Sequence, residues 1–581
     1  MDETELAGLV DRATHWRDAD PDPRTRLEVD RLIELVTSGD STVSGEARDE
    51  LQQRFAGSLQ FGTAGLRGAL GAGPNRMNRA VVIRAAAGIA AHLRATLKND
   101  DRPPRVVVGY DARHDSDVFA RDTCAVLTAA GCEARLLPGP LPTPVLAFAL
   151  RRLEAEAGIM VTASHNPPQD NGYKVYLGGR ADSSPGSGAQ IVPPTDDHIA
   201  HQIAHAPPAI DVPMATDGWQ VTGPQIVDEY LASAGAVLTA GAARQIDIVL
   251  TPMHGVGGET AARAFAAAGF PAPYLVPEQA TPDPDFPTVS FPNPEEPGAL
   301  DLALRAARER GADLVIANDP DADRCAVAVP TGGAGTADDP DWRMLRGDEV
   351  GALLGDYLLS SGGGTGGHKK TVASSIVSSQ LLARVARSHG ARHLETLTGF
   401  KWLARVPDLT YAYEEALGYC VAPGSVRDKD GISAALLIAE YAARLRAEGR
   451  TLLDALDDLA RRHGLHATDQ FSVRVDDLAQ ITAMLERITQ HPPATLAGAA
   501  VKTCEDLGEG VDGLPGTPGL RYRTTDGDRV IIRPSGTEPK LKCYLEVVIP
   551  VGGESVAEAR ATAAERLARI TADVSTALGI G

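Results

Sequence analysis

Residues 158–177 read GIMVTASHNPPQDNGYKVYL, two apolar runs joined by a short polar loop. The loop places Ser164 between small residues, next to His165 and ahead of two prolines. A loop that only turns the chain does not need this combination, so we expect Ser164 to face a functional site. The G-x-S-x-G elbow of a hydrolase nucleophile does not surround Ser164, which argues against a hydrolase triad.

Outward from this loop, strand-like and helix-like segments alternate along the chain. The alternation predicts α/β domains with parallel or mixed sheets, and the adjacent strands of the last part predict an α+β module. Val29, Leu32, Ile33 and Val36 lie on one face of an expected N-terminal helix. We expect an N-terminal helical extension packed on domain 1, followed by four domains, with these bounds: 1–55, 56–212, 213–340, 341–465 and 466–581.

Composition restricts the class of partner. The chain has 581 residues, too many for one core, and a formal net charge of -21 that repels nucleic acid and anionic membranes. No apolar run reaches the roughly 18 residues of a membrane span, and the acidic N-terminus lacks the features of a signal peptide. We therefore expect a cytoplasmic protein, with six scattered cysteines that are reduced and buried.

The stretch NDPDADR, residues 318–324, follows the apolar run DLVIA. Asp319, Asp321 and Asp323 alternate there, and three close carboxylates repel one another unless a cation lies among them. Hard oxygen ligands suit Mg²⁺, and Arg324 follows directly. A solvated acidic turn is the alternative interpretation. The offsets of an EF-hand are not present.

Because the whole chain is acidic, a phosphate site needs a local positive patch. RPSGTEPKLK, residues 533–542, combines small residues that expose backbone N–H groups with Arg533, Lys540 and Lys542. Amide donors and a planar guanidinium suit a phosphate dianion. An ordinary Ser-Gly turn with nearby lysines is the alternative.

Two stretches near residue 400 suit a sugar. TLTGFKW contains Thr398, Gly399 and Lys401, and YEEALGY contains Glu414 and Glu415. Carboxylates commonly accept hydrogen bonds from vicinal sugar hydroxyls, although both glutamates could instead be solvated surface residues. In RDKDG, residues 427–431, the pattern is that of a helix start, yet Lys429 could also work in a site.

Considered together, these loops suggest a role for Ser164. Serine is a poor nucleophile without activation, but opposite a metal loop and a phosphate loop it can carry a phosphoryl group, whose charge a metal would neutralise. His165 would shuttle protons or simply hydrogen-bond the loop.

The ordered set TASHNP, DPDADR, TGFKW with YEEALGY, and RPSGTEPK resembles the α-D-phosphohexomutase family of phosphoglucomutases and phosphomannomutases. FGTAGLRG, TPMHGVG and PNPEEP add to the resemblance, which runs from about residue 56 to the end. It implies three similar mixed-sheet α/β domains and a distinct C-terminal α+β domain around a central cleft. It also implies a relay in which a phosphoserine and a sugar exchange phosphate through a bisphosphorylated sugar.

The resemblance assigns roles position by position. It implies catalytic roles for Ser164, His165, Lys429, Arg67 and Arg324; Mg²⁺ ligation by Ser164, Asp319, Asp321 and Asp323; sugar contacts from Thr398, Gly399, Lys401 and Glu415; and phosphate contacts from Arg533, Ser535, Gly536, Thr537 and Lys540. It further implies a small sugar phosphate as substrate, a sugar bisphosphate such as glucose 1,6-bisphosphate as activator, and a monomer or homodimer.

The sequence departs from the commonest family pattern. Glu414 replaces a glycine and Leu417 a serine of the usual sugar loop, while Pro320 and Ala322 stand where glycines are frequent. TGFKW and EEALGY look more like the phosphopentomutase-like branch. We expect interconversion of hexose 1- and 6-phosphates, with glucose first. Mannose or pentose specificity, glucose-1,6-bisphosphate synthase activity and a non-catalytic sugar-phosphate-binding protein are the alternatives.

Overall fold

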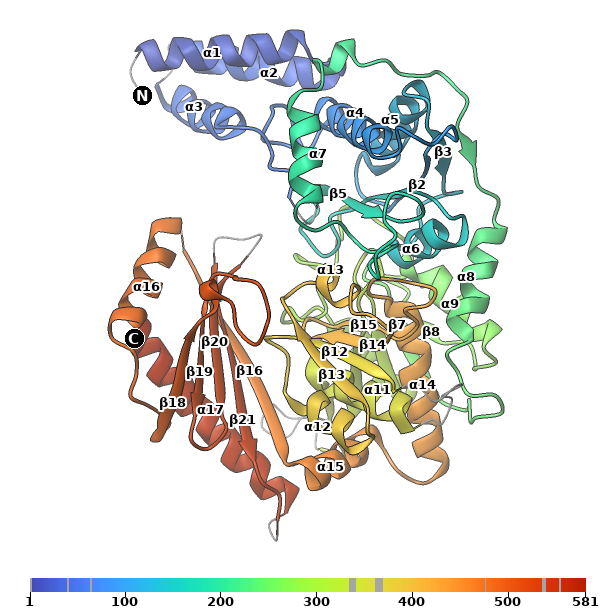
Figure 1. The fold of residues 1–581 in the computed structure, drawn as a ribbon, viewed down its shortest axis with the longest axis vertical. Helices are drawn as coiled ribbons and strands as arrows, with labels where there is room; N and C mark the ends of the chain where they lie inside the picture. The colour runs from blue at the N-terminus through green and yellow to red at the C-terminus, as the bar shows by residue number, and fades with distance from the viewer. Residues whose placement is uncertain are drawn as a thin grey trace. The chain divides into compact units, whose positions relative to one another are not determined.

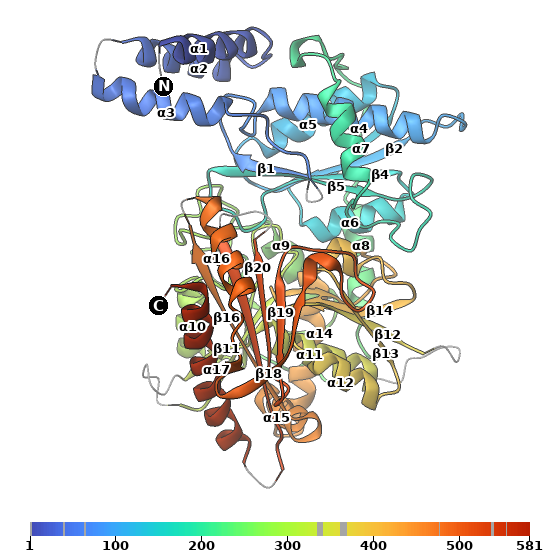
Figure 2. The same ribbon diagram turned by 60° about the vertical axis from the view of Figure 1, so that its left-hand side comes forward.

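The computed structural model describes residues 3–38, 41–62, 65–333, 341–360, 369–475, 477–535, 540–552 and 555–580. The chain forms two compact units. Unit 1 comprises residues 1–344, 404–407 and 418–443, and unit 2 comprises 345–403, 408–417 and 444–581. Figures 1 and 2 show the ribbon from two sides.

Unit 1 begins with three helices that pack on one another: α1 (Glu3–Asp18), α2 (Pro23–Thr37) and α3 (Ser41–Phe55). Asp22 caps α2, and Pro23 occupies its first turn, where the missing N–H costs nothing. Val29, Leu32 and Val36 are buried as the periodicity predicts, whereas Ile33 is only half-buried. Arg54 donates to the carbonyl oxygen of Ala72, which ties α3 to the loop of the first domain.

The first sheet of unit 1 has the order β1-β5-β4-β2-β3-β6. Its elements are β1 (Leu66–Ala69), α4 (Arg79–Thr96), β2 (Arg105–Tyr110), α5 (Ser116–Ala129), β3 (Glu133–Leu136), α6 (Thr143–Arg152), β4 (Ala157–Val161), β5 (Asp170–Leu177), α7 (Thr195–Ala204) and β6 (Gln220–Val221). Strands β2, β3, β4 and β6 are parallel, and β5 runs antiparallel to both β4 and β1. The sheet is therefore mixed.

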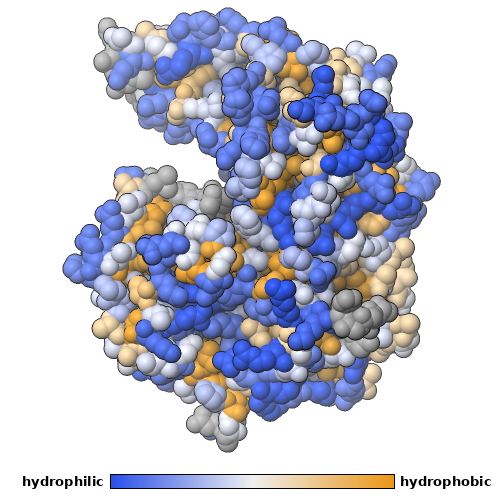
Figure 3. Space-filling view, in the orientation of Figure 1, coloured by the Kyte–Doolittle hydropathy of each residue, from blue (hydrophilic) through white to orange (hydrophobic). Residues whose placement is uncertain are grey.

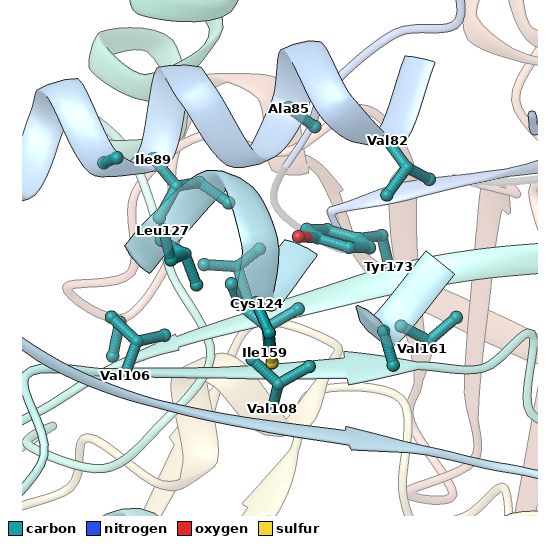
Figure 4. Close-up of a cluster of buried hydrophobic side chains, with 14 of the residues drawn as sticks. Val82, Ala85, Ile89, Val106, Val108, Cys124, Leu127, Ile159, Val161 and Tyr173 are labelled. Carbon is teal, nitrogen blue, oxygen red and sulfur yellow. The ribbon is translucent and has the colours of Figure 1, made fainter. Parts of the chain in front are cut away.

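The core of this domain lies between the sheet and helices α4 and α5. Val106, Val108 and Ile159 from the strands meet Ile89 and Leu127 from the helices in Figure 4. β-Branched residues suit the pleated strands, and their contact with the helices buries the apolar face of the sheet. Because these strands are parallel, their carboxyl ends lie at the same edge of the sheet, and the loops that follow them lie along that edge.

The second sheet of unit 1 has the order β11-β10-β9-β7-β8 and is also mixed. Its elements are α8 (Gln225–Gly235), β7 (Ile248–Thr251), α9 (Gly257–Ala267), β8 (Tyr274–Leu275), α10 (Asp301–Arg310), β9 (Leu314–Ala317), β10 (Ala326–Pro330) and β11 (Trp342–Met344). Unit 1 also takes in β15 (Gly418–Cys420) and most of α14 (Gly431–Ala447).

Unit 2 contains a further α/β part and the C-terminal sheet. In the first part, β12 (Thr371–Ser375) pairs in parallel with both β13 (Arg392–Thr396) and β14 (Leu409–Glu414). Its helices are α11 (Gly347–Ser360), α12 (Leu381–Ser388), α13 (Phe400–Leu403) and α15 (Leu452–His463). A capping box of Thr451 and Asp454 begins α15.

The C-terminal sheet has the order β16-β21-β20-β19-β18-β17, and every pair within it is antiparallel. Its elements are β16 (Leu465–Arg474), α16 (Leu478–Gln490), β17 (Thr495–Leu496), β18 (Ala499–Asp506), β19 (Leu520–Thr524), β20 (Arg529–Pro534), β21 (Lys540–Ile549) and α17 (Val556–Leu578). Helix α17 packs on β16 and β21 (Figure 1). The predicted series of α/β domains followed by a distinct α+β domain is confirmed.

The surface agrees with the composition. Hydrophilic side chains cover much of the face in Figure 3. Among the described residues, no helix combines the length and the apolarity that crossing a bilayer requires.

Five of the six cysteines are buried, but Cys504 is exposed, so the expectation of six buried thiols is wrong at this position. Cys504 lies on β18, where alternate residues face solvent.

Candidate active site

Ser164 lies three residues beyond the end of β4 and is 3% exposed. Its backbone is left-handed, with φ of 53°, a conformation that costs a residue with a side chain about 1–2 kcal/mol. Its Oγ donates to Oδ2 of Asp319 at 2.8 Å, and Nδ1 of His165 lies 3.3 Å from the same Oγ. Strain of this kind persists where the surroundings hold it, typically at functional sites.

The acidic loop follows β9, in the second domain of the same unit. Asp319, Asp321 and Asp323 are fully buried, and one oxygen from each lies within 4.8 Å of the others. Ala322, between Asp321 and Asp323, is left-handed, with φ of 54°, a conformation that glycine adopts more readily than alanine. The loop is therefore a buried cluster rather than a solvated turn.

Two ammonium groups reach this cluster. Nζ of Lys174, on β5, lies 2.7 Å from Oδ2 of Asp321 and 2.8 Å from Oδ2 of Asp323. Nζ of Lys429 lies 3.3 Å from the same oxygen of Asp323. Burial acts to raise the pKa of Asp323, but the two ammonium groups hold that pKa below its ordinary value. Burial and the neighbouring carboxylates raise the pKa of Asp319.

The cluster fits a divalent cation. Oδ1 of Asp321 and Oδ1 of Asp323 are buried and accept no hydrogen bond from any residue that the structure describes. Buried polar oxygens are normally satisfied, so such atoms indicate a missing partner. Carboxylate oxygens are the ligands that Mg²⁺ prefers. The triad can therefore bind a metal through oxygens that the protein itself leaves unused.

Arginines and a neutral imidazole surround Ser164. Arg67, on β1, donates to Oδ1 of Asn166 at 3.2 Å, and the backbone N–H of Arg324 donates to Oδ1 of Asp319 at 3.0 Å. Burial, with the charges of Arg324 and Arg67, lowers the pKa of His165 well below its ordinary value. This shift favours the neutral imidazole and makes His165 a weak base in the absence of other charges at the site.

The structure confirms the helix start in RDKDG and places Lys429 beside the acidic cluster. Asp430 accepts from the backbone N–H groups of Ile432 and Ser433, which begins helix α14 as the helix-start pattern predicts. Asp428 accepts from the hydroxyl of Tyr176 at 2.7 Å. Lys429 lies between Asp428 and Asp323, so its side chain belongs to the site and not to the helix cap.

In unit 2, the predicted sugar-binding residues follow parallel strands whose carboxyl ends share an edge. Thr398 and Gly399 follow β13, and Glu415 follows β14. Glu415 is not a freely solvated residue, because its Oε2 accepts from the hydroxyls of Ser375 and Ser378 at 3.0 and 3.1 Å. Gly399 has φ of 102° and precedes α13, and Lys401 is half-buried in that helix.

The predicted phosphate loop connects β20 and β21. Arg533 pairs across the hairpin with Lys542, and the N–H of Ser535 donates to the carbonyl of Lys540 at 2.8 Å. Cations directly opposite one another on two strands are destabilising unless an anion lies near. Nε of Arg533 is buried without an acceptor in the described part of the chain. Gly536 and Thr537 lie outside the described residues.

Four family models match the chain one after another between residues 58 and 568. Models described as phosphoglucomutase/phosphomannomutase alpha/beta/alpha domains I, II and III match residues 58–207, 228–333 and 346–463, and the model of the C-terminal domain matches 472–568. The chain belongs to the phosphoglucomutase/phosphomannomutase family. It is a phosphomutase, an isomerase that moves a phosphoryl group within a sugar phosphate.

Relatives of this phosphomutase carry several substrate names. A Haemophilus influenzae protein named "Probable phosphomannomutase" is 45% identical over 81% of this chain and 93% of its own. A Schizosaccharomyces pombe protein named "Probable phosphoribomutase" is 34% identical over 93% of each. A crystal structure of a "putative phosphomannomutase" from Thermus thermophilus, 25% identical, matches with a TM-score of 0.66 over 88% of this chain and 99% of its own.

Sequence reasoning missed several residues that contact the predicted site of this phosphomutase. Lys174 stands inside the apolar run that follows the Ser164 loop, and a lysine flanked there by Tyr173 and Val175 was the available signal. The hydroxyl of Thr143, at the start of α6, donates to Asp321. Thr143 is 178 positions from Asp321, and no local pattern connects the two.

Proposed function

We propose that this phosphomutase interconverts hexose 1- and 6-phosphates, with glucose as the first candidate, through a phosphoserine at Ser164. The observation that carries the proposal is the 2.8 Å hydrogen bond from Oγ of Ser164 to Asp319, beside two buried carboxylate oxygens that accept no hydrogen bond from the described residues. A serine in this position can exchange a phosphoryl group where cationic groups offset the added charge.

The proposed relay has two balanced steps. The bond between phosphorus and the serine oxygen breaks while phosphorus bonds to the free sugar hydroxyl, which loses its proton, and the serine oxygen takes up a proton. The resulting sugar bisphosphate then returns its other phosphoryl group to Ser164, whose hydroxyl loses its proton, and the sugar oxygen released takes up a proton. His165 and Lys429 are the proposed proton carriers, and Arg67 and Arg324 are proposed to steady the transferring group. The 3.3 Å separation between Nδ1 of His165 and Oγ of Ser164 supports this role.

Asp319, Asp321 and Asp323, with Ser164, are the residues proposed to hold Mg²⁺. The ion would supply charge neutralisation during phosphoryl transfer. Lys174 holds two of these carboxylates in place, because its ammonium group donates a hydrogen bond to Oδ2 of Asp321 and to Oδ2 of Asp323.

The sugar and its non-reacting phosphate would be bound by residues of unit 2. We assign sugar contacts to Thr398, Gly399, Lys401 and Glu415, and phosphate contacts to Arg533, Ser535, Gly536, Thr537 and Lys540. The paired cations of the β20–β21 hairpin support the second assignment. We further propose the domain bounds 56–212, 213–340, 341–465 and 466–581, activation by glucose 1,6-bisphosphate or an equivalent sugar bisphosphate, a monomer or homodimer, and a cytoplasmic location.

The test of the proposed function is Ser164→Ala. Intact-mass analysis of the wild-type protein, incubated with glucose 1,6-bisphosphate, should show one added phosphoryl group that Ser164→Ala lacks. Conversion of glucose 1-phosphate should fall by at least about a thousandfold in the variant, since the covalent route is removed. Full turnover by Ser164→Ala would exclude the relay.

Pentose phosphate is a second candidate substrate, because the relative named for ribose covers 93% of the chain. Rates with the 1-phosphates of glucose, mannose and ribose, compared as kcat/KM, separate the three specificities. Product formed only with an acyl-phosphate donor would indicate a bisphosphate synthase instead. Binding of every sugar phosphate without turnover would indicate a non-catalytic binding protein.

A further inference from the structure

The Ser164 loop turns four backbone carbonyls toward one side chain. Nη2 of Arg113 donates to the carbonyl oxygens of Ser164 at 2.7 Å and Asn166 at 2.5 Å. Nη1 of Arg113 donates to those of Pro167 at 2.8 Å and Asp170 at 3.1 Å. One guanidinium therefore satisfies four carbonyls of the loop that carries the proposed phosphoserine.

The side chain of Arg113 is itself held by contacts with Asp111 and Phe286. Its side chain is 1% exposed, and its Nε lies 3.4 Å from Oδ2 of Asp111. Asp111 is anchored in turn, since its backbone N–H donates to the carbonyl of Val161, at the end of β4. The ring of Phe286, from the second domain, lies 4.9 Å from the guanidinium carbon. A planar cation stacked on an aromatic face loses little freedom when it forms further hydrogen bonds.

These contacts bear on the strained backbone of Ser164. Its left-handed φ directs Oγ toward Asp319, and relaxation of φ to the ordinary region would redirect Oγ. Four converging carbonyl oxygens repel one another unless a donor lies among them, and only a guanidinium offers enough N–H groups in a fixed plane. Loss of that group would remove the Arg113 donor from the buried carbonyl of Ser164 and from three part-buried carbonyls, of which that of Pro167 would keep the N–H of Asp170. The loop would then rearrange to satisfy the others.

We propose that Arg113 is a positioning residue for phosphoryl transfer, which holds Ser164 in its left-handed conformation and keeps Oγ aimed at the acidic cluster. It acts through the backbone of the loop and need not touch the sugar. The inference rests on the proposed role of Ser164 as phosphate carrier. The alternative is that Arg113 stabilises the domain as any buried arginine does, with no specific effect on the reaction.

The experiment compares Arg113→Met and Arg113→Lys with Arg79→Met. Arg79 is a partly buried arginine of the same domain that pairs with Asp122, and it serves as the matched control. Misplacement of a reacting atom by about 1 Å can cost about a hundredfold in rate. We expect kcat to fall about a hundredfold in Arg113→Met and about tenfold in Arg113→Lys, while KM for the sugar phosphate changes less than about twofold. The control should keep its kcat.

A second readout separates positioning from general stability. Guanidinium ion at low millimolar concentration should raise kcat of Arg113→Ala several-fold, because it can occupy the space that the side chain leaves. The same ion should not raise kcat of Arg79→Ala. Melting temperatures of all variants are measured in parallel, so that rates are compared only among folded proteins.

The outcomes distinguish the inference from the proposed function. If the wild-type protein takes up no phosphate at Ser164, the proposed function fails and the inference fails with it. If the wild-type protein is phosphorylated but the Arg113 variants keep kcat within about threefold of Arg79→Met, only the inference is overturned. Should Arg113→Met not fold, Arg113→Lys decides by the same measure, and an unchanged kcat overturns the inference.

Discussion

The ammonium nitrogen of Lys174 lies 2.7 Å from Oδ2 of Asp321, and both side chains are buried. The same nitrogen reaches Asp323, so one cation joins two carboxylates of the predicted metal cluster. Removing one partner of a buried ion pair leaves an uncompensated charge, which is far costlier than the pair is stabilising. The stability of the metal-free folded protein therefore depends on the positive charge of Lys174.

Lys174→Met should therefore destabilise the metal-free protein by roughly 3 kcal/mol. Added Mg²⁺ should restore part of the loss, because it would neutralise the same carboxylates. Denaturant unfolding with and without Mg²⁺ measures both effects. Lys98→Met, at an exposed lysine, is the control, and equal unfolding free energies for the two variants would contradict the expectation.

Asp321→Asn should weaken Mg²⁺ binding at least about tenfold, or about 1.4 kcal/mol. The amide keeps the shape of the side chain but removes the charge that a hard cation requires. Isothermal titration of Mg²⁺ into the wild-type and variant proteins checks this directly. Asp313→Asn, outside the acidic loop, should bind as the wild-type protein does. An unchanged affinity in Asp321→Asn would remove Asp321 from the ligand set.

Arg533→Ala should raise KM for the sugar phosphate about tenfold or more and leave kcat nearly unchanged. The reason is that a contact with a phosphate that does not react stabilises the ground state and the transition state equally. Steady-state kinetics measure the two constants separately. A fall in kcat with KM unchanged would place Arg533 at the reacting centre instead.

Ser378→Ala should alter sugar binding through Glu415. Ser378 donates its hydroxyl to Oε2 of Glu415 and accepts from the backbone N–H of the same residue. Losing these bonds, each worth about 1 kcal/mol, should raise KM roughly five- to thirtyfold. Ser388→Ala, in which the hydroxyl bonds only its own helix, is the control. Equal KM values would show that Glu415 is held without Ser378.

Acidification should destabilise the protein through His393. Burial and the charge of Arg529 lower the pKa of His393 from 6.5 to about 4. The folded state keeps the imidazole neutral, so its contribution to stability is complete above pH 6.5 and is lost as pH falls toward 4. We expect a loss of about 3 kcal/mol over that window.

His393→Gln removes the titrating group and can retain the hydrogen bond to Ser374, which His393 makes at 2.9 Å. Unfolding free energies at several pH values between 4 and 7 should therefore vary less in His393→Gln than in the wild-type protein. His491→Gln, at an exposed histidine of the same unit, should retain the wild-type slope. Parallel slopes for all three proteins would contradict the prediction.

The sequence predicts the elements whose pattern is local. Apolar runs followed by short loops placed Ser164 after β4 and the aspartates after β9, because a buried strand and its loop are contiguous in the chain. Helix α2 showed its buried face through the spacing of Val29, Leu32 and Val36. The adjacent strands of the last part indicated its α+β class, but the pairing of β16 with β21 joins strands that are far apart in the chain.

The remaining contacts depend on distant parts of the chain. Arg113 meets the Ser164 loop across 51 positions, and Ser378 meets Glu415 across 37, without any periodicity that joins them. Lys174 is a charged residue within an apolar strand. No local pattern shows that the antiparallel strand β5 brings its side chain to the acidic loop. The exposure of Cys504 could not be predicted, because the sequence of β18 does not show which face of the strand the rest of the domain covers.

The discontinuity of unit 1 has a consequence for synthesis on the ribosome. Unit 1 is not complete at residue 344, because it also requires residues 418–443, which include Lys429. Roughly a hundred residues separate Asp323 from Lys429, a delay of about 5–20 s at ordinary rates of translation. During this interval the acidic loop and Lys174 lack the contact with Lys429, which has not yet been synthesised. Unit 1 therefore cannot complete its folding as soon as residue 344 has been synthesised. A nascent chain halted between Asp323 and Lys429 would be a target for chaperones.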